Sequence, residues 1–268
     1  MQKKLLYVIL VLEDFMKEDN IITINRDGWN LLVRKKHKYS NSSLPNYGFY
    51  LDHNENDLKL ITDITNSTFL EVGCASGNSL KYLGDKGAKE LWGIDISKEQ
   101  IKKAKSNLSN YNSHLIVSTM EEFNGVPKNY FDYVISIFSI GYTSNLEKTI
   151  ENIVISLKEG GIFILSWTHP LFDKLSIENS KVVMKVSYFD ELNKEIFKGE
   201  DKIKLIQKSV TMSSLLNLLI QKGLTLEEIH EEKTIITKEK VDFVSNFWKD
   251  ELISMCPTTI ILKLKKKG

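Results

Sequence analysis

Cysteine is scarce in this chain, and its scarcity excludes two structural classes. Only Cys74 and Cys256 occur among the 268 residues, so they provide neither a disulfide framework nor a zinc site. Two isolated cysteines also favour a reducing, cytoplasmic setting. Four of the five histidines have no partner at ligand spacing, and we therefore expect no metal and no catalytic triad around His37, His53, His114 and His230.

The chain also lacks an excess of charge of either sign. Lys and Arg number 36 against 35 Asp and Glu, which leaves a formal net charge of +1. Proteins that bind nucleic acid usually carry a strongly basic face, so we expect no such partner. The C-terminal lysines at 263 and 265–267 are interpreted as a solvated tail, with contact to nucleic acid or a membrane as the alternative.

Long hydrophobic runs are absent too. The most apolar N-terminal stretch, Leu5–Leu12, is far shorter than a membrane span. It follows two lysines, meets Glu13 and Asp14, and has no small-residue cleavage site after it, unlike a secretory signal. We expect it to form a helix or strand packed on the body, or else that the natural start is Met16. No membrane partner is expected.

What the sequence does contain is a regular alternation that begins near residue 68. Short apolar runs rich in β-branched residues alternate with amphipathic stretches, which is typical of a parallel sheet with helices on both faces. Continuous apolar runs within it are those expected of strands buried on both sides. The predicted strands are Thr68–Gly73, Leu91–Asp95, Leu115–Ser118, Phe131–Phe138 and Gly161–Trp167, and the predicted helices are Ser79–Lys86, Lys98–Asn107 and Leu146–Leu157.

The alternation ends after Pro170, and the pattern over residues 171–208 is mixed. A Gly at position 223 suits the C′ position of a preceding helix. The expected elements are two antiparallel strands (Val182–Tyr188 and Lys202–Gln207), a helix (about Met212–Lys222), and two further strands (Thr225–His230 and Thr258–Lys265), the last an antiparallel edge strand.

The turn after the first strand carries the strongest functional signal. Small residues between a strand and a helix let the backbone approach a ligand, and a helix N-terminus favours an anionic group. Glu71 at the mouth of the turn would repel a pyrophosphate but suits an ammonium group. Asn78 replaces the third glycine of the dinucleotide fingerprint, and Asp95 ends the next strand, where an acid accepts hydrogen bonds from ribose hydroxyls.

A ligand with a ribose, a carboxylate and an ammonium group but no phosphate is S-adenosylmethionine. Two alternatives remain open at this stage. The turn can be a plain connection between strand and helix, or it can belong to a nicotinamide or flavin site.

Several segments together resemble the class I S-adenosylmethionine-dependent methyltransferases. They occur in the order found in that family and cover residues 68–265. The segment Glu71–Gly77 (EVGCASG) resembles its first motif, Phe131–Ser136 its fourth strand, Leu157–Ser166 its Leu-Lys-Pro-Gly-Gly turn and fifth strand, and Pro257–Ile261 its closing strand.

The resemblance implies an α/β, Rossmann-like, doubly wound sheet of seven mostly parallel strands whose last strand is antiparallel. It implies an N-terminal helical lid over residues 1–60 and a methyltransferase domain over 61–268, with a substrate-cap insert at about 171–208. The most similar members are bacterial small-molecule methyltransferases. By the same resemblance, the residues that bind S-adenosyl-L-methionine are Tyr47, Glu71, Gly73, Cys74, Ala75, Gly77, Asp95, Ile96, Met120, Glu121 and Phe138.

Two positions depart from the family pattern. Ala75 stands where the family usually has its middle glycine, and a left-handed backbone there would cost about 1–2 kcal/mol. We therefore expect an ordinary backbone angle at Ala75 and a slightly tighter pocket. Thr119 stands near the place of an acid that faces adenine, so adenine recognition is expected to depend on the Met120 backbone and on Glu121.

Candidates for the acceptor side lie before and after these motifs. Tyr47 is expected to donate to the ligand carboxylate and Trp29 to cover the substrate, unless both only pack. Residues after the fourth strand should face the transferred methyl group, because ligands bind at the carboxyl ends of strands; these are Phe138, Ser139 and Tyr142.

Two further candidates follow the fifth strand. His169, which has a pKa near neutrality, is the best-placed group to remove a substrate proton, unless it only holds the end of the strand. Residues 188–190 are expected to form a wall of the acceptor pocket or a dimerisation arm.

The sequence thus predicts in-line methyl transfer to a small molecule or short peptide, with His169 and Tyr142 as catalytic candidates. An RNA methyltransferase and a non-catalytic scaffold of the same fold are the alternatives. The protein is expected to be a monomer or a homodimer.

Overall fold

The computed structural model describes residues 18–36, 44–48, 53–179, 181–198, 201–231, 233 and 250–268. The expectations for Leu5–Leu12 and Met16 concern residues outside these ranges. No helix in the described ranges has the length and apolarity to cross a membrane.

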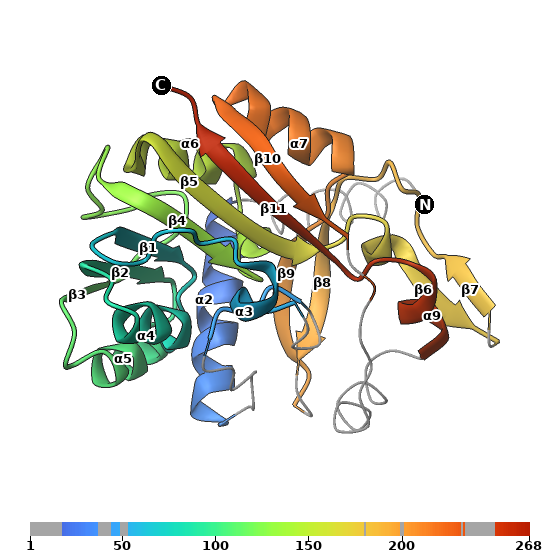
Figure 1. Cartoon of the computed structure of the whole chain (residues 1–268). Coiled ribbons are helices and arrows are strands. Elements are labelled where there is room, and N and C mark those ends of the chain that lie inside the picture. Colours follow the sequence, from blue (N-terminus) through green and yellow to red (C-terminus); the bar gives the residue numbers. More distant parts are fainter. Residues whose placement is uncertain are drawn as a thin grey trace.

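A seven-stranded sheet forms the centre of the molecule, in the order β10-β11-β5-β4-β1-β2-β3 (Figure 1). Strands β1 to β5 pair in parallel, and β11 runs antiparallel to both of its neighbours. The bounds are β1 Thr68–Val72, β2 Glu90–Asp95, β3 Ser113–Val117, β4 Phe131–Ile137, β5 Leu157–Thr168, β10 Leu224–His230 and β11 Thr259–Lys266.

Helices cover both faces of this sheet because successive strand residues point to opposite sides. Leu70 and Val134 belong to one buried cluster, whereas Phe69 and Tyr133 belong to the other. The first cluster is closed by α6 (Leu146–Ser156) and α7 (Met212–Gln221), the second by α4 (Asn78–Asp85) and α5 (Lys98–Asn107). The predicted doubly wound α/β fold is thereby confirmed.

Local capping explains where these helices begin. Each of three helices starts after a polar side chain that accepts a hydrogen bond from the first turn, which stabilises a helix by about 1 kcal/mol. These side chains are Ser97 before α5, Asn145 before α6 and Thr211 before α7.

One strand prediction was wrong. The last strand, β11, does not lie at an edge but between β5 and β10, and β10 forms the edge instead. The burial patterns agree with this, since β10 alternates exposed and half-buried residues after the buried Leu224, while β11 is buried along Thr259–Leu264.

The insert after β5 also differs from the prediction. The two strands expected to pair with each other belong to separate hairpins, β6–β7 and β8–β9. The element η2 (Phe172–Lys174), a short 3-10 turn, precedes them. The hairpin strands are β6 Leu175–Glu178, β7 Lys181–Met184, β8 Asn193–Lys198 and β9 Ile203–Lys208.

Helix α2 (Glu18–Arg34) packs on β9, as Figure 1 shows. Asn25, Gly28 and Leu32 share the packed face, at the three- and four-residue spacing of one side of a helix. A Cβ added at Gly28 would lie 2.7 Å from the Lys204 carbonyl oxygen, so the helix and strand approach as closely as glycine permits. Leu32 joins Ile203 and Leu205 in a small buried cluster. The division into a lid and a methyltransferase domain at residue 60 stays a prediction.

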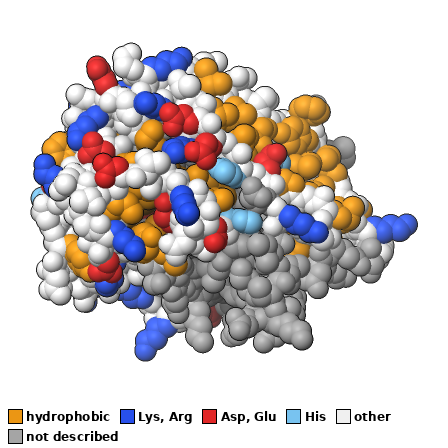
Figure 2. Space-filling view, in the orientation of Figure 1, with side chains coloured by type: hydrophobic (Ala, Val, Ile, Leu, Met, Phe, Trp, Pro, Cys, Tyr) orange, Lys and Arg blue, Asp and Glu red, His pale blue; other side chains and the backbone are white. Residues whose placement is uncertain are grey.

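The surface carries interspersed charges of both signs. In Figure 2, blue and red side chains alternate over the left part of the face, and hydrophobic side chains gather toward its right. On this face the charge distribution is that expected from a net charge of +1.

Candidate functional site

A cavity of about 750 Å³ opens where β1, β2, β4 and β5 end. Its size falls within the range of about 300–1,000 Å³ typical of small-molecule sites. The short turn η1 (Ile140–Tyr142), α2 and the β8–β9 hairpin supply the remaining walls.

Gly73 lies in this cavity at the end of β1 with a φ of +73°. A Cβ at this position would lie 2.3 Å from the Ser139 Cβ, so only glycine fits. The amides of Gly73 and Cys74 both donate to the Ile94 carbonyl oxygen, at 2.8 and 2.9 Å. The turn is therefore fixed to β2 as well as to β4.

The prediction for Ala75 was wrong. Ala75 has a φ of +46°, in the left-handed region that costs a non-glycine residue about 1–2 kcal/mol. Its amide donates to the Asp95 Oδ2 at 2.9 Å. This hydrogen bond to a carboxylate offsets the cost of the backbone angle.

Asp95 is held by two main-chain amides. Besides the Ala75 amide, the Ser97 amide donates to Oδ1 at 2.8 Å. Burial nevertheless raises the pKa of Asp95 to about 6. The carboxylate lines the cavity next to Ile96, where it retains the capacity to accept further hydrogen bonds.

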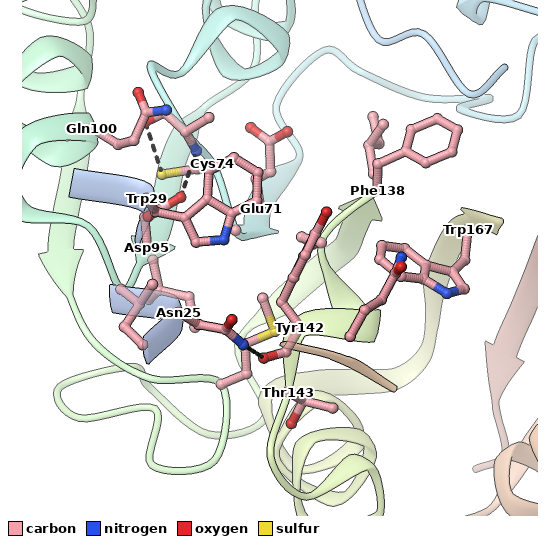
Figure 3. Close-up of a pocket in the computed structure, with 18 of the residues that line it drawn as sticks. Asn25, Trp29, Glu71, Cys74, Asp95, Gln100, Phe138, Tyr142, Thr143 and Trp167 are labelled. Atoms are coloured by element: carbon pink, nitrogen blue, oxygen red, sulfur yellow. Dashed lines mark hydrogen bonds between the residues drawn. The ribbon is translucent and has the colours of Figure 1, made fainter. Parts of the chain in front are cut away.

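Glu71 is the most unusual group of the cavity. Its side chain is buried, and its Oε2 has no hydrogen-bond partner among the described residues. Burial raises the pKa of Glu71 to about 8, against the opposing effect of a hydrogen bond with Ser79. Because a buried unpaired carboxylate is costly, this arrangement favours a cationic ligand at Oε2. Figure 3 shows Glu71, Cys74 and Asp95 close together.

Cys74 and Gly77 differ in their relation to the cavity. Cys74 lines it, and burial raises the pKa of its thiol well above the usual value. Gly77 does not line it; with a φ of +76° it starts α4, and a Cβ there would lie 2.8 Å from Leu108 Cδ1. Its contribution to the site is the close packing of α4 on α5.

Met120 and Glu121 both line the cavity, but a polar atom of each already accepts hydrogen bonds from other residues of the protein. The Met120 carbonyl oxygen accepts from Asn152 Nδ2 at 3.2 Å. The Oε1 of Glu121 accepts from Thr143 Oγ1 at 2.6 Å and from the amide and hydroxyl of Ser144 at 2.6 and 2.8 Å. This oxygen holds the β4–α6 connection, and the adenine role of both residues stays a prediction.

The predicted role of Tyr47 is contradicted. Its ring is completely buried and does not line the cavity, and its hydroxyl donates to Glu55 Oε2 at 2.7 Å. Glu55 lies in α3 (Glu55–Leu58) and accepts the Ile61 amide with its other oxygen. Tyr47 therefore anchors α3 rather than reaching a ligand.

The predicted role of His169 is contradicted as well. His169 Nδ1 accepts from the Leu171 amide at 3.1 Å, and Nε2 lies 2.7 Å from Glu231 Oε1. The ring is buried beside the cavity but does not line it. It holds the end of β5, which is the second of the two roles that the sequence left open.

Three aromatic side chains form the opposite side of the cavity. Tyr142 lies between Trp29 and Trp167 (Figure 3), with ring centroids 5.0 and 5.4 Å away and interplanar angles of 88° in both pairs. Phe138 lines the same side with a φ of +49°. Trp29, Phe138 and Tyr142 are thus brought together as the sequence predicts.

The predicted wall at residues 188–190 is absent from the cavity lining, and Phe189 is 81% exposed. The hairpin β8–β9 takes that place with Lys194, Ile196, Lys198 and Gln207. Sequence reasoning missed these residues and also Asn25, because no spacing rule applies to the insert and no motif marks them.

The buried side chain of Asn25 connects three elements of the cavity wall. Asn25 Nδ2 donates to the carbonyl oxygens of Tyr142 and Ile206, both at 2.9 Å, and Oδ1 accepts from the Ile206 amide at 2.7 Å. One buried side chain thereby joins α2, η1 and β9 around the cavity.

Comparison with known proteins identifies the central part of this fold. Residues 70–165 match the family model of a methyltransferase domain. A crystal structure from Listeria monocytogenes, assigned to the S-adenosylmethionine-dependent methyltransferases, superposes with a TM-score of 0.65 at 20% identity. The superposition covers 78% of this chain and 94% of that one.

Two curated relatives match over shorter stretches. An uncharacterised protein of Haemophilus influenzae is 25% identical over 122 residues, which is 42% of this chain and 47% of that protein. The mitochondrial arginine-hydroxylase NDUFAF5 of Rattus norvegicus is 27% identical over 96 residues, 35% of this chain and 27% of that protein. The chain thus matches less than half the length of either curated relative. With this family match at residues 70–165 and its β10-β11-β5-β4-β1-β2-β3 sheet, the chain has a fold similar to that of S-adenosylmethionine-dependent methyltransferases.

Proposed function

We propose that this protein transfers a methyl group from S-adenosyl-L-methionine to a small-molecule or short-peptide acceptor bound in the same cavity. The observation that carries the proposal is the buried Glu71, whose Oε2 lacks a partner at the cavity wall. Such an oxygen suits the ammonium group of the ligand, and a pyrophosphate would be repelled by it.

The remaining parts of the cofactor fit the same end of the cavity. Asp95 accepts two amides and has lone pairs left for the ribose hydroxyls. Ile96 and Met120 supply apolar surface on either side. When bound, S-adenosylmethionine supplies a sulfonium methyl group that is already activated for transfer.

The residues of this chain then have to orient the acceptor and exclude water. Trp29, Tyr142 and Trp167 provide a rigid apolar wall for that purpose, and α2 and β9 close over it. Correct orientation of two reactants can lower a barrier by about 7–11 kcal/mol. We assign Tyr142 to this positioning of the acceptor.

A base on the protein is not part of the proposal. Asp173, which lines the acceptor side, is paired with Lys194 and accepts from Ser209 Oγ at 2.8 Å. With His169 held away from the cavity, the described acceptor side offers no unengaged carboxylate or imidazole. The acceptor nucleophile is therefore expected to arrive already deprotonated.

Calorimetric titration with S-adenosylhomocysteine tests the cofactor site. Asp95→Ala and Glu71→Gln should each weaken binding at least about tenfold, since a hydrogen bond to a charged group contributes about 1.5–3 kcal/mol. Asp85→Asn on α4 and Glu122→Gln, both exposed and outside the cavity, are matched controls that should bind normally. Unchanged affinity in both site variants would overturn the assignment.

Methyl transfer needs a separate test, because the rat protein that this chain resembles over 96 residues is named an arginine-hydroxylase. Transfer of radiolabel from methyl-labelled S-adenosylmethionine to a panel of small acids, amines, phenols and peptides should label at least one acceptor. Tight cofactor binding without any labelled product would support the non-catalytic scaffold instead.

Three finer expectations accompany the proposal. Elution from heparin at low salt is expected, and retention at moderate salt would favour an RNA substrate. Light scattering is expected to give a monomer or homodimer. A reducing, cytoplasmic setting stays a prediction from the scarcity of cysteine.

A further inference from the structure

The β8–β9 hairpin places one cation directly on the aromatic wall of the cavity. Lys198 Nζ lies 5.0 Å from the ring centroid of Trp29 and 5.5 Å from that of Tyr142. Both distances are within the range of about 6 Å in which an ammonium group is attracted to an aromatic face. No motif marks Lys198, yet it lines the acceptor side of the cavity.

Among the described residues, Lys198 has no carboxylate within ion-pair distance, whereas its neighbours do. Lys194, on the same strand, is paired with Asp173, so these two charges cancel. Lys204 on β9 is paired with Glu195 at 2.6 Å. The exposed Lys36 at the end of α2 also lines the cavity and adds positive charge. The acceptor side therefore has an excess of positive charge centred on Lys198.

This charge discriminates between classes of acceptor. A cationic acceptor would meet a ring surface already covered by an ammonium group, and like charges at this separation repel. The binding affinity of a neutral acceptor would be neither raised nor lowered by the charge of Lys198. An anionic acceptor would gain an ion pair in a partly buried cavity, where charge interactions are stronger than in water.

The shape of the wall restricts the body of the acceptor. Trp29 and Trp167 stand perpendicular to Tyr142 on its two sides, which leaves flat ring surfaces and ring edges facing the cavity. Aromatic rings pack favourably on such a wall in offset or edge-to-face contact.

We infer that the acceptor is a flat aromatic acid whose carboxylate pairs with Lys198 and whose ring packs on Tyr142 and Trp167. The inference rests on the proposed function, since it assigns the second substrate of the same cavity. Lys198 is on this view the residue that selects for negative charge.

Three probes of equal shape and different charge test the selection: 2-naphthoate, 2-naphthamide and 2-naphthylmethylamine. Their affinities are measured by calorimetry and ligand-observed NMR, with and without saturating S-adenosylhomocysteine. We expect 2-naphthoate to bind at least tenfold more tightly than either of the others. Equal affinities, tighter binding of the amine, or no binding of any probe would overturn the inference.

Variants of Lys198 test whether that residue is the cause. Lys198→Met keeps an unbranched apolar stem and should remove the tenfold preference, while Lys198→Arg should retain it. Lys181→Met, on exposed β7 outside the cavity, is the matched control and should bind the probes like the unaltered protein. A preference for 2-naphthoate that survives in Lys198→Met would also overturn the inference.

The titration with S-adenosylhomocysteine separates this inference from the proposed function. Lys198→Met should bind S-adenosylhomocysteine as the unaltered protein does, because Lys198 lies on the acceptor side. A protein that binds no S-adenosylhomocysteine but prefers the acid would refute the proposed function alone. Normal cofactor binding without a charge preference would refute only the inference.

Discussion

Two carboxylates at neighbouring strand ends, the buried Glu71 and the half-buried Asp95, dominate the site at the scale of single residues. Their approach follows from the sequence, because β1 and β2 are parallel neighbours and Glu71 and Asp95 lie near the ends of both. The distance from solvent does not follow from the sequence, and it is burial that raises both pKa values.

The raised pKa of Glu71 predicts a pH dependence of cofactor binding. With a pKa of about 8, Glu71 is mostly protonated at pH 6 in the unliganded protein, whereas an ammonium ligand pairs with the ionised form. Affinity for S-adenosylhomocysteine should therefore rise as the pH increases from 6 to 8, with release of a proton. Calorimetry in buffers of different ionisation enthalpy measures that proton, and Glu71→Gln should abolish the release.

The same shift affects stability with the opposite sign. A folded pKa above the unfolded value means that the folded chain still holds a proton that the unfolded chain has lost. The free energy of unfolding of the unliganded protein should thus fall between about pH 4.5 and pH 8. The control is Glu71→Gln. If the free energy of unfolding of the unaltered protein rose over this pH interval relative to that of Glu71→Gln, the raised pKa of Glu71 would be contradicted.

Ala75 supplies a prediction of the reverse kind, a substitution that stabilises. Ala75→Gly removes a strain of about 1–2 kcal/mol and adds an entropy cost to folding of about 0.4–1 kcal/mol. The free energy of unfolding measured in urea should therefore rise by up to about 1.6 kcal/mol. Ala104→Gly, within α5, should instead destabilise by at least about 0.5 kcal/mol, and equal losses in both variants would refute the account.

The backbone angle of Ala75 was mispredicted for an identifiable reason. Intrinsic preference disfavours a left-handed alanine, and that preference is all that the local sequence contains. The compensating contact comes from Asp95, twenty residues away. A rule based only on neighbouring residues does not include a hydrogen bond to such a distant side chain.

At the scale of secondary-structure elements, the parallel part of the sheet was predictable because its strands are short apolar runs that alternate with amphipathic stretches. Capped helices follow β2 and β4. The amino-acid pattern does indicate that β10, and not β11, forms the edge of the sheet. β10 alternates polar and apolar residues, as a half-exposed strand does, while Thr259–Leu262 is continuously apolar apart from its threonine. The hairpins of the insert carry no comparable signal, since their strands are mostly half-exposed.

The anchor of α3 gives a prediction at this scale. Tyr47→Phe removes the hydroxyl that donates to Glu55 Oε2 and leaves that buried oxygen unpaired, which should cost about 1–3 kcal/mol of stability. Affinity for S-adenosylhomocysteine should stay within about twofold. Tyr82→Phe is the control, because the Tyr82 hydroxyl donates to Asn56 Oδ1 in an exposed hydrogen bond. This variant should lose less stability than Tyr47→Phe. A large loss of affinity in Tyr47→Phe would restore its original assignment as a ligand contact.

At the scale of the whole molecule, the cavity is built from segments far apart in the sequence. The cofactor end comes from β1, β2 and their turns and was predictable from motifs. The acceptor end combines α2, η1 and β8–β9, which meet only through tertiary packing. Trp29 and Tyr142 became candidates because they flank motifs, and both line this cavity. Lys198 and Asn25 line it as well but were not candidates.

Asn25 supplies the prediction for this scale. Asn25→Ala leaves the Tyr142 and Ile206 main-chain groups without the partner they have now and should cost about 1–3 kcal/mol of stability. Binding of 2-naphthoate should weaken at least about fivefold, because the acceptor wall loses its link, while S-adenosylhomocysteine binding changes little. Asn124→Ala, at an exposed hydrogen bond to Glu122, should alter neither affinity.

The close approach of Gly28 to the Lys204 carbonyl has a consequence for engineering. Because Gly28 leaves no room for a side chain of its own against β9, a hairpin transplanted from a related protein would have to accept this one spacing or clash. Helix and hairpin must therefore be exchanged as a matched pair. Libraries that diversify only one of them should yield folded proteins far less often than libraries that recombine both together.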